Sequence, residues 1–388
     1  MYIRRWKSSM KKTFVLAPDS FKESMSAKEA CEAMERGIRK VLPDAEVFQV
    51  PMADGGEGTV DALVAGSNGT RVKVVVSGPI PTEKVETYFG LLADKQTAVI
   101  EMAKANGIEL LAEEKRNPLI TSTYGTGEMI KAALDQGVKK IIIGIGGSVT
   151  NDGGAGMAQA LGVHLLDKEN NELATGGGAL SSLAKIDKTR IDARLADTEI
   201  IIASDVTNPL IGLNGASAVF GPQKGATPEM VEELDKNLAH YAEIIKKDLA
   251  IDIAGQAGAG AAGGLGAGLL VFTGACMHSG VDLIIDLTRL EERIAQADYV
   301  FTGEGGMDFQ TKFGKTPYGV AKAAQKYNKP VFACAGYIGE QVDVLYDEGM
   351  TAIFGILDKA GSLDMALKSG KANLERTVEN IIRVLCIE

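Results

Sequence analysis

Four short segments constrain the fold of this chain more than any other feature, because each places a combination of acidic, small hydroxyl or glycine residues directly after a β-rich apolar run. They are residues 17–22, 53–58, 146–154 and 302–305, and we interpret each as a loop that ends a strand. Loops at the carboxyl ends of parallel strands are where open α/β sheets bind ligands. Glycine lets backbone N–H groups approach phosphate, and carboxylates hold Mg²⁺ or accept a proton. The pattern predicts an enzyme site for a phosphorylated cofactor.

Strand and helix patterns alternate at both ends of the chain. The N-terminal part predicts strands at 13–17 and 46–52 and helices that begin at a Ser26–Glu29 capping box and near Glu57 to Thr59. The C-terminal part predicts strands at 299–302, 331–335 and 352–357. It also predicts helices at 340–348 and 363–385, and one with Pro317 at its first position. Between them, 71–76, 85–92 and 97–102 resemble antiparallel strands, and 138–145 and 199–203 are further buried strands.

These patterns predict an α/β protein of two domains. The first is a doubly wound Rossmann- or flavodoxin-like domain built from both ends of the chain, residues 10–75 and 286–388. The second is a mixed α/β domain inserted at 76–285. Residues 1–9 are interpreted as an N-terminal extension.

Charge and cysteine content limit the class of protein. The net charge of -10 argues against a nucleic-acid-binding protein, which needs a basic face. No run approaches the roughly 20 apolar residues of a membrane span. The basic segment 2–7 lacks an apolar stretch, so we do not expect it to be a secretory signal. The four cysteines have no metal-binding spacing and are interpreted as reduced thiols, so we expect a cytoplasmic protein.

Two familiar nucleotide motifs are matched only weakly here. Gly258-x-Gly260-x-x-Gly263 fits the dinucleotide fingerprint, but it lies in an alanine- and glycine-rich tract after only a short apolar run. Gly314-Lys315-Thr316 resembles the end of a P-loop, but Phe309 stands where its first glycine is required. A phosphate site in this chain must therefore have another design.

The segment Gly146–Gly154 is the most specific of the four. An apolar strand runs into Gly146, Gly147, Ser148, Thr150, Asn151 and Asp152, and a helix is predicted to begin near Ala155. A strand, an amide-rich loop and a helix N-terminus together form a geometry that binds phosphate without a P-loop lysine. A purely structural loop rarely needs so many polar residues in succession.

The other candidates are Asp19, Ser20 and Lys22; Asp54, Gly55, Gly56 and Glu57; Asp205; Asn214, Gln223 and Lys224; and Glu304, Asp308, Gln310, Thr311 and Lys315. For the first two of these groups, a turn or helix entry is the alternative to a functional role. Carboxylates and lysines at strand ends provide bases, metal ligands and counter-charges for phosphate.

Five of these motifs together resemble bacterial-type glycerate kinases. They are Ala-Pro-Asp-Ser-Phe-Lys, Asp-Gly-Gly-Glu-Gly-Thr, Gly-Gly-Ser-x-Thr-Asn-Asp-Gly-Gly, Val-Phe-Gly-Pro-Gln-Lys-Gly and Thr-Gly-Glu-Gly-x-x-Asp-x-Gln-Thr, in the family's order over residues 11–385. The resemblance implies ATP-dependent, Mg²⁺-dependent phosphorylation of D-glycerate by a two-domain α/β enzyme, and it favours 2-phosphoglycerate over 3-phosphoglycerate as the product. The chain departs from the family at Gly306, where arginine is usual.

On this basis the expected mechanism is direct phosphoryl transfer. Asp205 is the first choice for the base that orients or deprotonates the acceptor hydroxyl, and Asp19 is the second. Lys22, Lys224 and Lys315 would offset phosphate charge, and Asp54, Glu304 and Asp308 would hold Mg²⁺. The alternatives are an NAD-dependent hydroxy-acid enzyme that uses the Gly258 tract and a non-catalytic sugar-acid sensor. The sequence leaves open whether the protein is a homodimer.

Overall fold

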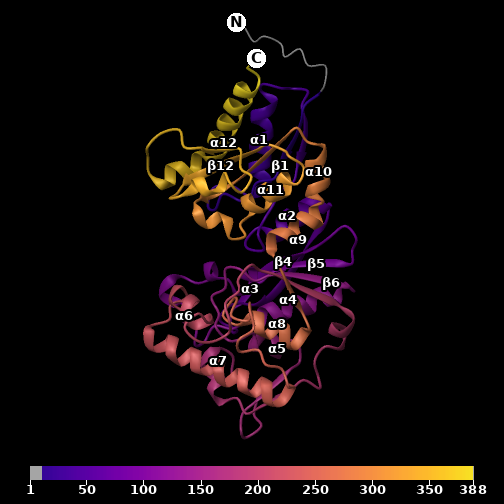
Figure 1. The fold of residues 1–388 in the computed structure, drawn as a ribbon. Coiled ribbons are helices and arrows are strands. Elements are labelled where there is room, and N and C mark those ends of the chain that lie inside the picture. Colours follow the sequence, from indigo (N-terminus) through magenta and orange to yellow (C-terminus); the bar gives the residue numbers. More distant parts are fainter. Residues whose placement is uncertain (1–10, 388) are drawn as a thin grey trace. The chain divides into compact units, whose positions relative to one another are not determined.

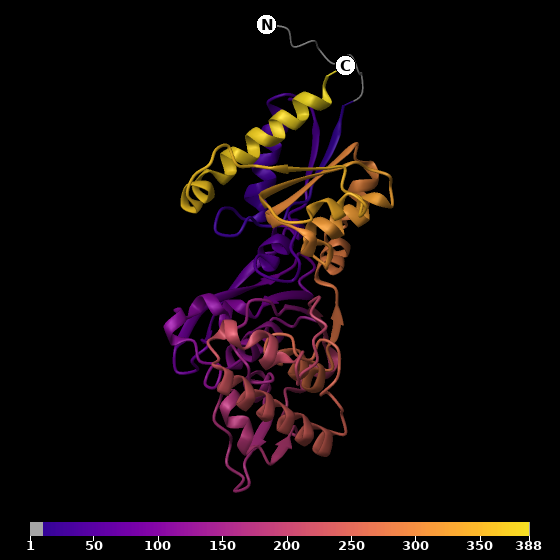
Figure 2. The same cartoon turned by 60° about the vertical axis from the view of Figure 1, so that its left-hand side comes forward.

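The structure is a computed structural model that describes residues 11–387, and it divides the chain into two compact units (Figures 1 and 2). Within the described residues, the first unit contains the segments up to Asp54, Asp61–Ser67 and from Val281 onward. The second unit contains Gly55–Val60 and Asn68–Gly280. The predicted extension at 1–9 lies outside the described residues.

The first unit is built on a sheet whose five strands are all parallel. Their order is β13-β12-β11-β1-β2. The strands are β1 (Thr13–Leu16), β2 (Glu46–Gln49), β11 (Tyr299–Met307), β12 (Val331–Ile338) and β13 (Ala352–Gly355). From β1 the chain proceeds to β2 on one side, whereas the later strands are added on the other side, beginning with β11. The carboxyl ends of β1 and β11 are therefore where a ligand site is expected in an open parallel sheet.

Helices cover both faces of this sheet. They are α1 (Ala27–Arg39), α10 (Leu290–Gln296), α11 (Thr316–Gln325) and α12 (Leu363–Leu385), while α2 (Thr59–Ser67) and α9 (Gly280–Thr288) connect the two units along the chain. Helices α1 and α12 lie side by side over the core residues Phe14, Phe301 and Phe332 (Figures 1 and 2). The predicted capping box of α1 is confirmed, because Ser26 and Glu29 bond to each other's backbone N–H groups.

The second unit is built on a mixed sheet of order β10-β9-β6-β5-β4-β3. Its strands are β3 (Thr70–Ser77), β4 (Lys84–Leu91), β5 (Thr97–Glu101), β6 (Lys140–Gly144), β9 (Glu199–Ala203) and β10 (Cys276–His278), and β7 (His164–Leu166) pairs separately with β8 (Lys185–Asp187). The predicted antiparallel pairing of the first three strands is confirmed. The remaining strands pair in parallel, so β5, β6 and β9 end at one edge.

The helices of the second unit are short, with one exception. They are α3 (Ala103–Asn106), α4 (Tyr124–Asp135), α5 (Ala155–Ala160), α6 (Ala216–Phe220), α7 (Pro228–Leu249) and α8 (Leu265–Thr273). Isoleucines at 141 and 143, together with Met129, Met157 and Leu265, belong to the core between sheet and helices. The α/β class predicted from the sequence is confirmed in both units.

Three local predictions are wrong. Residues 302–305 are not a loop but part of β11, because β12 continues beside them and pairs Gly303 with Cys334 and Gly306 with Tyr337. Residues 340–348 form only a short 3₁₀ turn, Val342–Leu345, which follows Gln341 in the left-handed region. Pro317 is the second helical residue, since α11 begins at Thr316.

Candidate functional site

Each unit carries one cluster of candidate residues at the carboxyl ends of parallel strands. In the first unit, Asp19 follows β1, Glu304 lies in β11 and Asp54 follows β2. The backbone holds the first two together, because Asp19 N–H donates to Gly303 C=O at 2.8 Å. We call Asp19, Asp54 and Glu304 the carboxylate cluster.

The carboxylate of Asp19 is fixed by two hydrogen bonds. Its Oδ1 accepts from the N–H of Ser20 at 2.6 Å, and its Oδ2 accepts from the hydroxyl of Thr316, at the start of α11, at 2.5 Å. Burial and the neighbouring charge of Asp54 raise the pKa of Asp19 to about 7, although the two hydrogen bonds oppose the rise. Asp19 is therefore a positioned carboxyl group that changes its charge near neutral pH.

Glu304 is held in a similar way by residues that follow it in the chain. Its Oε1 accepts from the hydroxyl of Thr311 at 3.1 Å, and its Oε2 lies 3.4 Å from Nζ of Lys315. Burial raises the pKa of Glu304 to about 7, and Lys315 opposes that rise. Lys315 also donates to Gly306 C=O at 3.3 Å, so this lysine compensates part of the negative charge.

The other predicted residues of this unit have simpler surroundings. Asp308 caps the 3₁₀ turn Phe309–Lys312 by accepting from Gln310 N–H at 2.8 Å. Gln310 and Lys22 are exposed, and Ser20 is half-buried. Asp308 therefore has a local structural role in addition to any role in binding.

The carboxylate cluster suits a divalent cation only in part. Within residues 11–387, no group of three or more His, Cys, Asp or Glu side chains is placed to hold a metal ion. Mg²⁺, however, usually takes only one or two carboxylates and completes its shell with water and substrate phosphates. The charge of Asp54 helps to raise the pKa values of Asp19 and Glu304, so the three carboxyl groups are close enough to form this partial kind of site.

In the second unit, the central feature is the segment Gly146–Gly154, here called the glycine loop, which lies between β6 and α5. Lys224 lies in a 3₁₀ turn, Pro222–Lys224, about 70 residues later in the chain, and it is buried against this loop. Its Nζ donates to the hydroxyl of Ser148 and to the C=O of Thr150, both at 2.7 Å. Burial lowers the pKa of Lys224 to about 7, and the charge of Asp152 opposes the fall.

Asp152 contacts the protein rather than an open surface. Its completely buried carboxylate accepts from the N–H and hydroxyl of Thr123, both at 2.9 Å, and from the N–H groups of Gly154 and Gly156 at 3.1 and 3.2 Å. Burial nevertheless raises the pKa of Asp152. The carboxylate joins the beginnings of α4 and α5, so it fixes the shape of the glycine loop.

The same loop contains buried polar atoms without a partner in the described part of the chain. The hydroxyl of Thr150 and Oδ1 of Asn151 have none, whereas Nδ2 of Asn151 donates to Ser217 at 3.0 Å. Gly146 and Gly147 are exposed. Buried polar groups usually have partners, so unpaired atoms beside a buried cation indicate a place for water or a polar ligand.

The loop at residues 55–58 lies against the carboxyl ends of β6 and β9. Gly55 has φ +89°, and a Cβ there would lie 2.7 Å from Ala203 C=O. A Cβ at Gly146 would lie 3.2 Å from the Cα of Gly56. Glycine is needed at these positions for close backbone approach, and Glu57 is exposed beside them.

The last predicted residues of this unit are spread over its surface. Asp205, directly beyond β9, is exposed and accepts from Gly280 N–H at 3.3 Å. Asn214 and Gln223 are also exposed, and the C=O of Asn214 accepts from Asn208 at 2.9 Å. None of these three has the burial that distinguishes Asp19 and Lys224.

Sequence reasoning missed several residues that build these clusters. Thr316 fixes Asp19, and Thr123 fixes Asp152, but each is far from its partner in the chain. Glu101 is buried at the end of β5, where it accepts from Val60 N–H at 2.7 Å and lies 3.4 Å from Lys104. Its place at the end of an apolar strand was the only sequence signal for it.

The glycine-rich tract near Gly258 packs closely against the glycine loop. The last element before it in the described chain is the helix α7, whereas the dinucleotide motif requires a strand directly before the glycines. A Cβ at Gly263 would lie 1.9 Å from Thr150 C=O, and one at Gly264 would lie 2.7 Å from the Cα of Gly153. The tract therefore allows two backbone segments to pack closely.

No helix within residues 11–387 combines the length and the hydrophobicity needed to cross a bilayer.

Comparisons with known proteins agree on one family. Residues 14–386 match the model of the Glycerate kinase family. The chain is similar to a glycerate kinase from Haemophilus influenzae, with 50% identity over 97% of this chain and 99% of the relative. It is also similar to a glycerate 2-kinase from Escherichia coli (strain K12), with 51% identity over 96% of this chain and 98% of the relative. A crystal structure from Salmonella typhimurium LT2 has a TM-score of 0.88 and 49% identity, and the match covers 97% of this chain and 98% of that one.

Proposed function

The chain belongs to the glycerate kinase family and is an enzyme of that family, and we propose that it transfers the γ-phosphoryl group of ATP to the 2-hydroxyl of D-glycerate. The oxygen of this hydroxyl forms a bond to the γ-phosphorus, and the bond between that phosphorus and the β,γ-bridging oxygen breaks. ADP leaves with the electron pair, and the hydroxyl proton passes to a carboxylate of the enzyme. Such a reaction depends mainly on positioning and on neutralising charge.

We assign the proton acceptor to Asp19. Three observations support the choice: its place beyond β1, its two fixed hydrogen bonds and a pKa of about 7. A base works best when its pKa lies near the working pH. Asp205 was the first choice from sequence, but it is exposed and makes a longer contact at 3.3 Å, so the geometry favours Asp19.

We assign anion binding in the second unit to Lys224 and the exposed backbone of Gly146 and Gly147. This assignment rests on the position of Lys224, which is buried. Its ammonium group has three N–H donors, and two of them already bond to the glycine loop, at Ser148 and Thr150. The unpaired hydroxyl of Thr150 lies on the same loop. A lysine with a lowered pKa gains charge when an anion arrives, so binding a phosphate or carboxylate would stabilise its protonated form.

Mg²⁺ would be held in the first unit by Asp54 and Glu304, with phosphate oxygens completing its shell. When bound, it would neutralise charge that develops on the phosphates. Lys315 would share that task from its place beside Glu304. The parallel strand order of this unit further supports our prediction of a doubly wound, flavodoxin-like domain.

The 2-hydroxyl is preferred because a relative with 51% identity is named a glycerate 2-kinase. The free state of all four cysteines supports a reducing compartment, and we propose the cytoplasm.

A coupled assay tests the function directly. ATP, Mg²⁺ and D-glycerate are supplied, ADP release is followed, and the product is passed to enolase. We expect glycerate-dependent ADP release and immediate conversion by enolase. Conversion that requires phosphoglycerate mutase first would show that the 3-hydroxyl is the acceptor. ADP release that does not increase when D-glycerate is added would contradict the proposal.

A further inference from the structure

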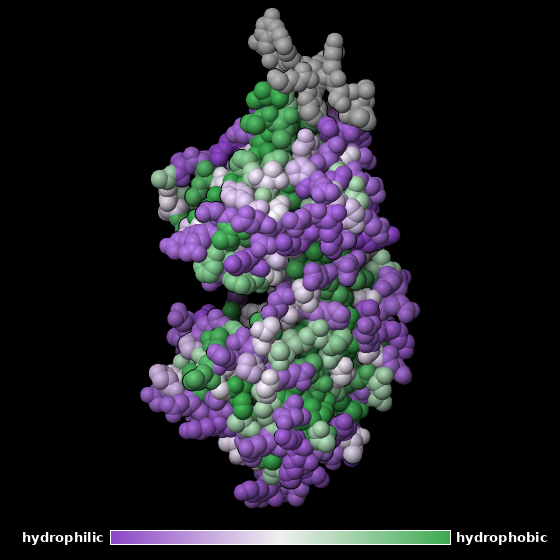
Figure 3. All heavy atoms as spheres, viewed as in Figure 1, coloured by the Kyte–Doolittle hydropathy of each residue, from purple (hydrophilic) through white to green (hydrophobic). Residues whose placement is uncertain are grey.

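Buried charge is rare in this chain, and one instance lies outside the two clusters described above. Figure 3 shows hydrophilic residues over much of the visible surface. Within the described residues, only three charged side chains are buried: Asp152, Lys224 and Glu101. The first two belong to the glycine loop and its surroundings. Because a buried charge costs stability unless it is paired and hydrogen-bonded, the burial of Glu101 requires a separate explanation.

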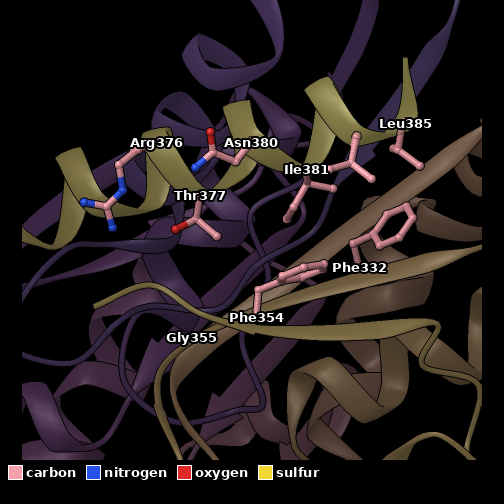
Figure 4. A pocket seen from close by; sticks show the side chains of 9 residues that line it. Phe332, Phe354, Gly355, Arg376, Thr377, Asn380, Ile381 and Leu385 are labelled. Carbon is pink, nitrogen blue, oxygen red and sulfur yellow. The ribbon is translucent and has the colours of Figure 1, made fainter. Parts of the chain in front are cut away.

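The cavity beside α12 contains no buried charge in the described chain. It has a volume of about 350 Å³ and lies between α12 and strands β12 and β13 (Figure 4). Figure 4 shows Phe354 below the helix and Ile381 pointing down from it. Its charged lining residue, Arg376, is half-buried and donates to Ile356 C=O at 3.1 Å. These mainly apolar residues select no particular ligand.

Glu101 is the last residue of β5, and both oxygens of its carboxylate have partners. Oε1 accepts from the N–H of Val60 at 2.7 Å, and Oε2 lies 3.4 Å from Nζ of Lys104. The same Nζ lies 4.5 Å from the ring centroid of Tyr88, which also helps to hold it in place. The ion pair with Lys104 compensates the charge of the buried carboxylate.

The contact with Val60 fixes the beginning of α2. Val60 is the second residue of that helix, so its N–H has no acceptor within the helix. Gly58, directly before α2, has no side chain that could cap the helix. Glu101 therefore caps α2 from β5, and its negative charge suits the positive end of a helix. A position that phosphate often occupies in proteins is thus taken by the protein's own carboxylate.

The loop at residues 55–58, which leads into α2, packs against the end of β6 and the glycine loop. A Cβ at Gly144 would collide with the C=O of Gly55, and a Cβ at Gly146 would lie 3.2 Å from the Cα of Gly56. The two loops are therefore in backbone contact. A shift of the loop at residues 55–58 would move the surface on which the glycine loop rests.

The ion pair also leads to the glycine loop from its other side. Lys104 lies in α3, and shortly after this helix the N–H of Ile108 donates to the C=O of Gly147 at 2.8 Å. Gly147 is one of the two exposed glycines to which we assign anion binding. The pair of Glu101 and Lys104 therefore connects the loop at residues 55–58 with a segment that bonds to the glycine loop.

We propose that Glu101 is a positioning residue, which holds the loop at residues 55–58 and the glycine loop in the arrangement that binds an anionic substrate. It touches no substrate itself, because it is buried and both of its carboxylate oxygens bond to the protein. This role rests on the proposed function, in which Lys224, Gly146 and Gly147 bind the anion. Small displacements of such groups weaken binding, since hydrogen bonds depend steeply on distance and angle.

Steady-state kinetics of the full-length protein test this role. Glu101→Ala removes the bond to Val60 and the ion pair, so the KM for ATP or for D-glycerate should rise roughly tenfold, while kcat changes less than about twofold. Glu101→Gln keeps an oxygen that can accept from Val60, and we expect it to raise the same KM only about two- to threefold. The matched control is Glu199→Gln, which breaks an exposed ion pair with Lys140 in the same sheet and should leave both KM values unchanged.

Hydrogen exchange tests the same role without any activity. In Glu101→Ala, the amide hydrogens of residues 58–61 and of residues 145–149 should exchange at least about fivefold faster than in the unaltered protein. In Glu199→Gln their rates should be unchanged. Faster exchange at residues 58–61 alone would show that Glu101 only caps α2, and it would overturn the proposal.

The kinetic outcomes separate this proposal from the proposed function. Unchanged KM values for both substrates in a folded Glu101→Ala variant would overturn the positioning role, as would a loss confined to kcat. If the unaltered protein releases no ADP in response to D-glycerate, the proposed function fails, and hydrogen exchange still decides whether Glu101 holds the two loops. Should Glu101→Ala fail to fold, the same two measurements on Glu101→Gln decide, because both should show the smaller effect.

Discussion

The carboxylate cluster of the first unit and the glycine loop of the second occupy equivalent places in their sheets but have opposite electrostatics. In the first, burial and repulsion raise the pKa of Asp19 and Glu304 to about 7. In the second, burial lowers the pKa of Lys224 to about 7. The comparison shows that the strand-loop-helix arrangement determines the position of an ionisable side chain. The surrounding residues and its burial determine its pKa, and therefore its charge at neutral pH. One cluster suits a proton or a cation, and the other suits an anion.

The largest predicted effect comes from Asp19→Asn, which keeps the shape of the side chain but removes its ability to accept a proton. We expect kcat to fall about 10²- to 10⁴-fold, with little change in the KM for ATP. Steady-state kinetics of the coupled assay measure both. Asp44→Asn, at an exposed aspartate of the same unit, is the control and should have normal kcat. A larger loss in Asp205→Asn than in Asp19→Asn would return the role to Asp205.

A smaller effect of a different kind is expected from Lys224→Met. Because a hydrogen bond to a charged group contributes about 1.5–3 kcal/mol, kcat/KM should fall roughly 10- to 100-fold, mainly through KM for an anionic substrate. Lys236→Met, at a lysine that is highly exposed on α7, should leave both constants unchanged. An unaltered KM in Lys224→Met would mean that this lysine only supports the loop.

The pH dependence of stability should have opposite signs in the two clusters. The pKa of Asp19 rises from 3.8 to about 7 on folding, so the folded state binds more protons in that range and its stability falls as pH rises through it. The pKa of Lys224 falls from 10.5 to about 7, so the folded state binds fewer protons and its stability increases as pH rises from about 7 to 10.5. Each group therefore costs stability in its charged, buried form.

Thermal unfolding of the two variants measures this difference. Asp19→Asn should raise the Tm at pH 8 but not at pH 4, and Lys224→Met should raise it at pH 7 more than at pH 10. A change of one kcal/mol in the free energy of unfolding corresponds to a shift in Tm of roughly 2–4 °C for a domain of 150–250 residues. If either variant changed the Tm equally at its two pH values, the change in Tm would not come from the ionisation of the replaced group.

The smallest predicted effect is at Gly306, where the resemblance to glycerate kinases leads us to expect an arginine. A Cβ there would lie 3.7 Å from the ring of Tyr337, which is ordinary contact, so a side chain can be accommodated. We expect Gly306→Arg to add a cation near Lys315 and to lower the KM for ATP roughly two- to fivefold, as for a partly exposed ion pair. Gly306→Ala is the control with no charge. The same KM in both variants would rule out an electrostatic effect.

The sequence predicted the strands and loops of both clusters because apolar runs that end in glycine and acidic residues are local patterns. It did not predict that 302–305 continue β11, since that depends on pairing with β12, about 30 residues later. It also grouped Asp152 with ligand-binding residues. Only the fold reveals that the carboxylate of Asp152 already accepts a hydrogen bond from Thr123.

The burial of Lys224 was equally hidden from the sequence. Its neighbours Gln223 and Gly225 are exposed, so the local pattern resembles a surface turn. The lysine is buried because the chain folds this turn onto Ser148 and Thr150, more than 70 residues earlier. Charge states of buried groups depend on such distant contacts, and for that reason sequence patterns identify candidates better than they assign roles.

Direct titration of the two groups by NMR tests the central claim, which is that the clusters are tuned toward neutral pH from opposite sides. The carboxyl carbon signal of Asp19 and the Nζ signal of Lys224 would be assigned by their loss in Asp19→Asn and Lys224→Met. We predict that both groups titrate near pH 7 in the free enzyme. An aspartate that titrates near 3.8 together with a lysine near 10.5 would contradict the account.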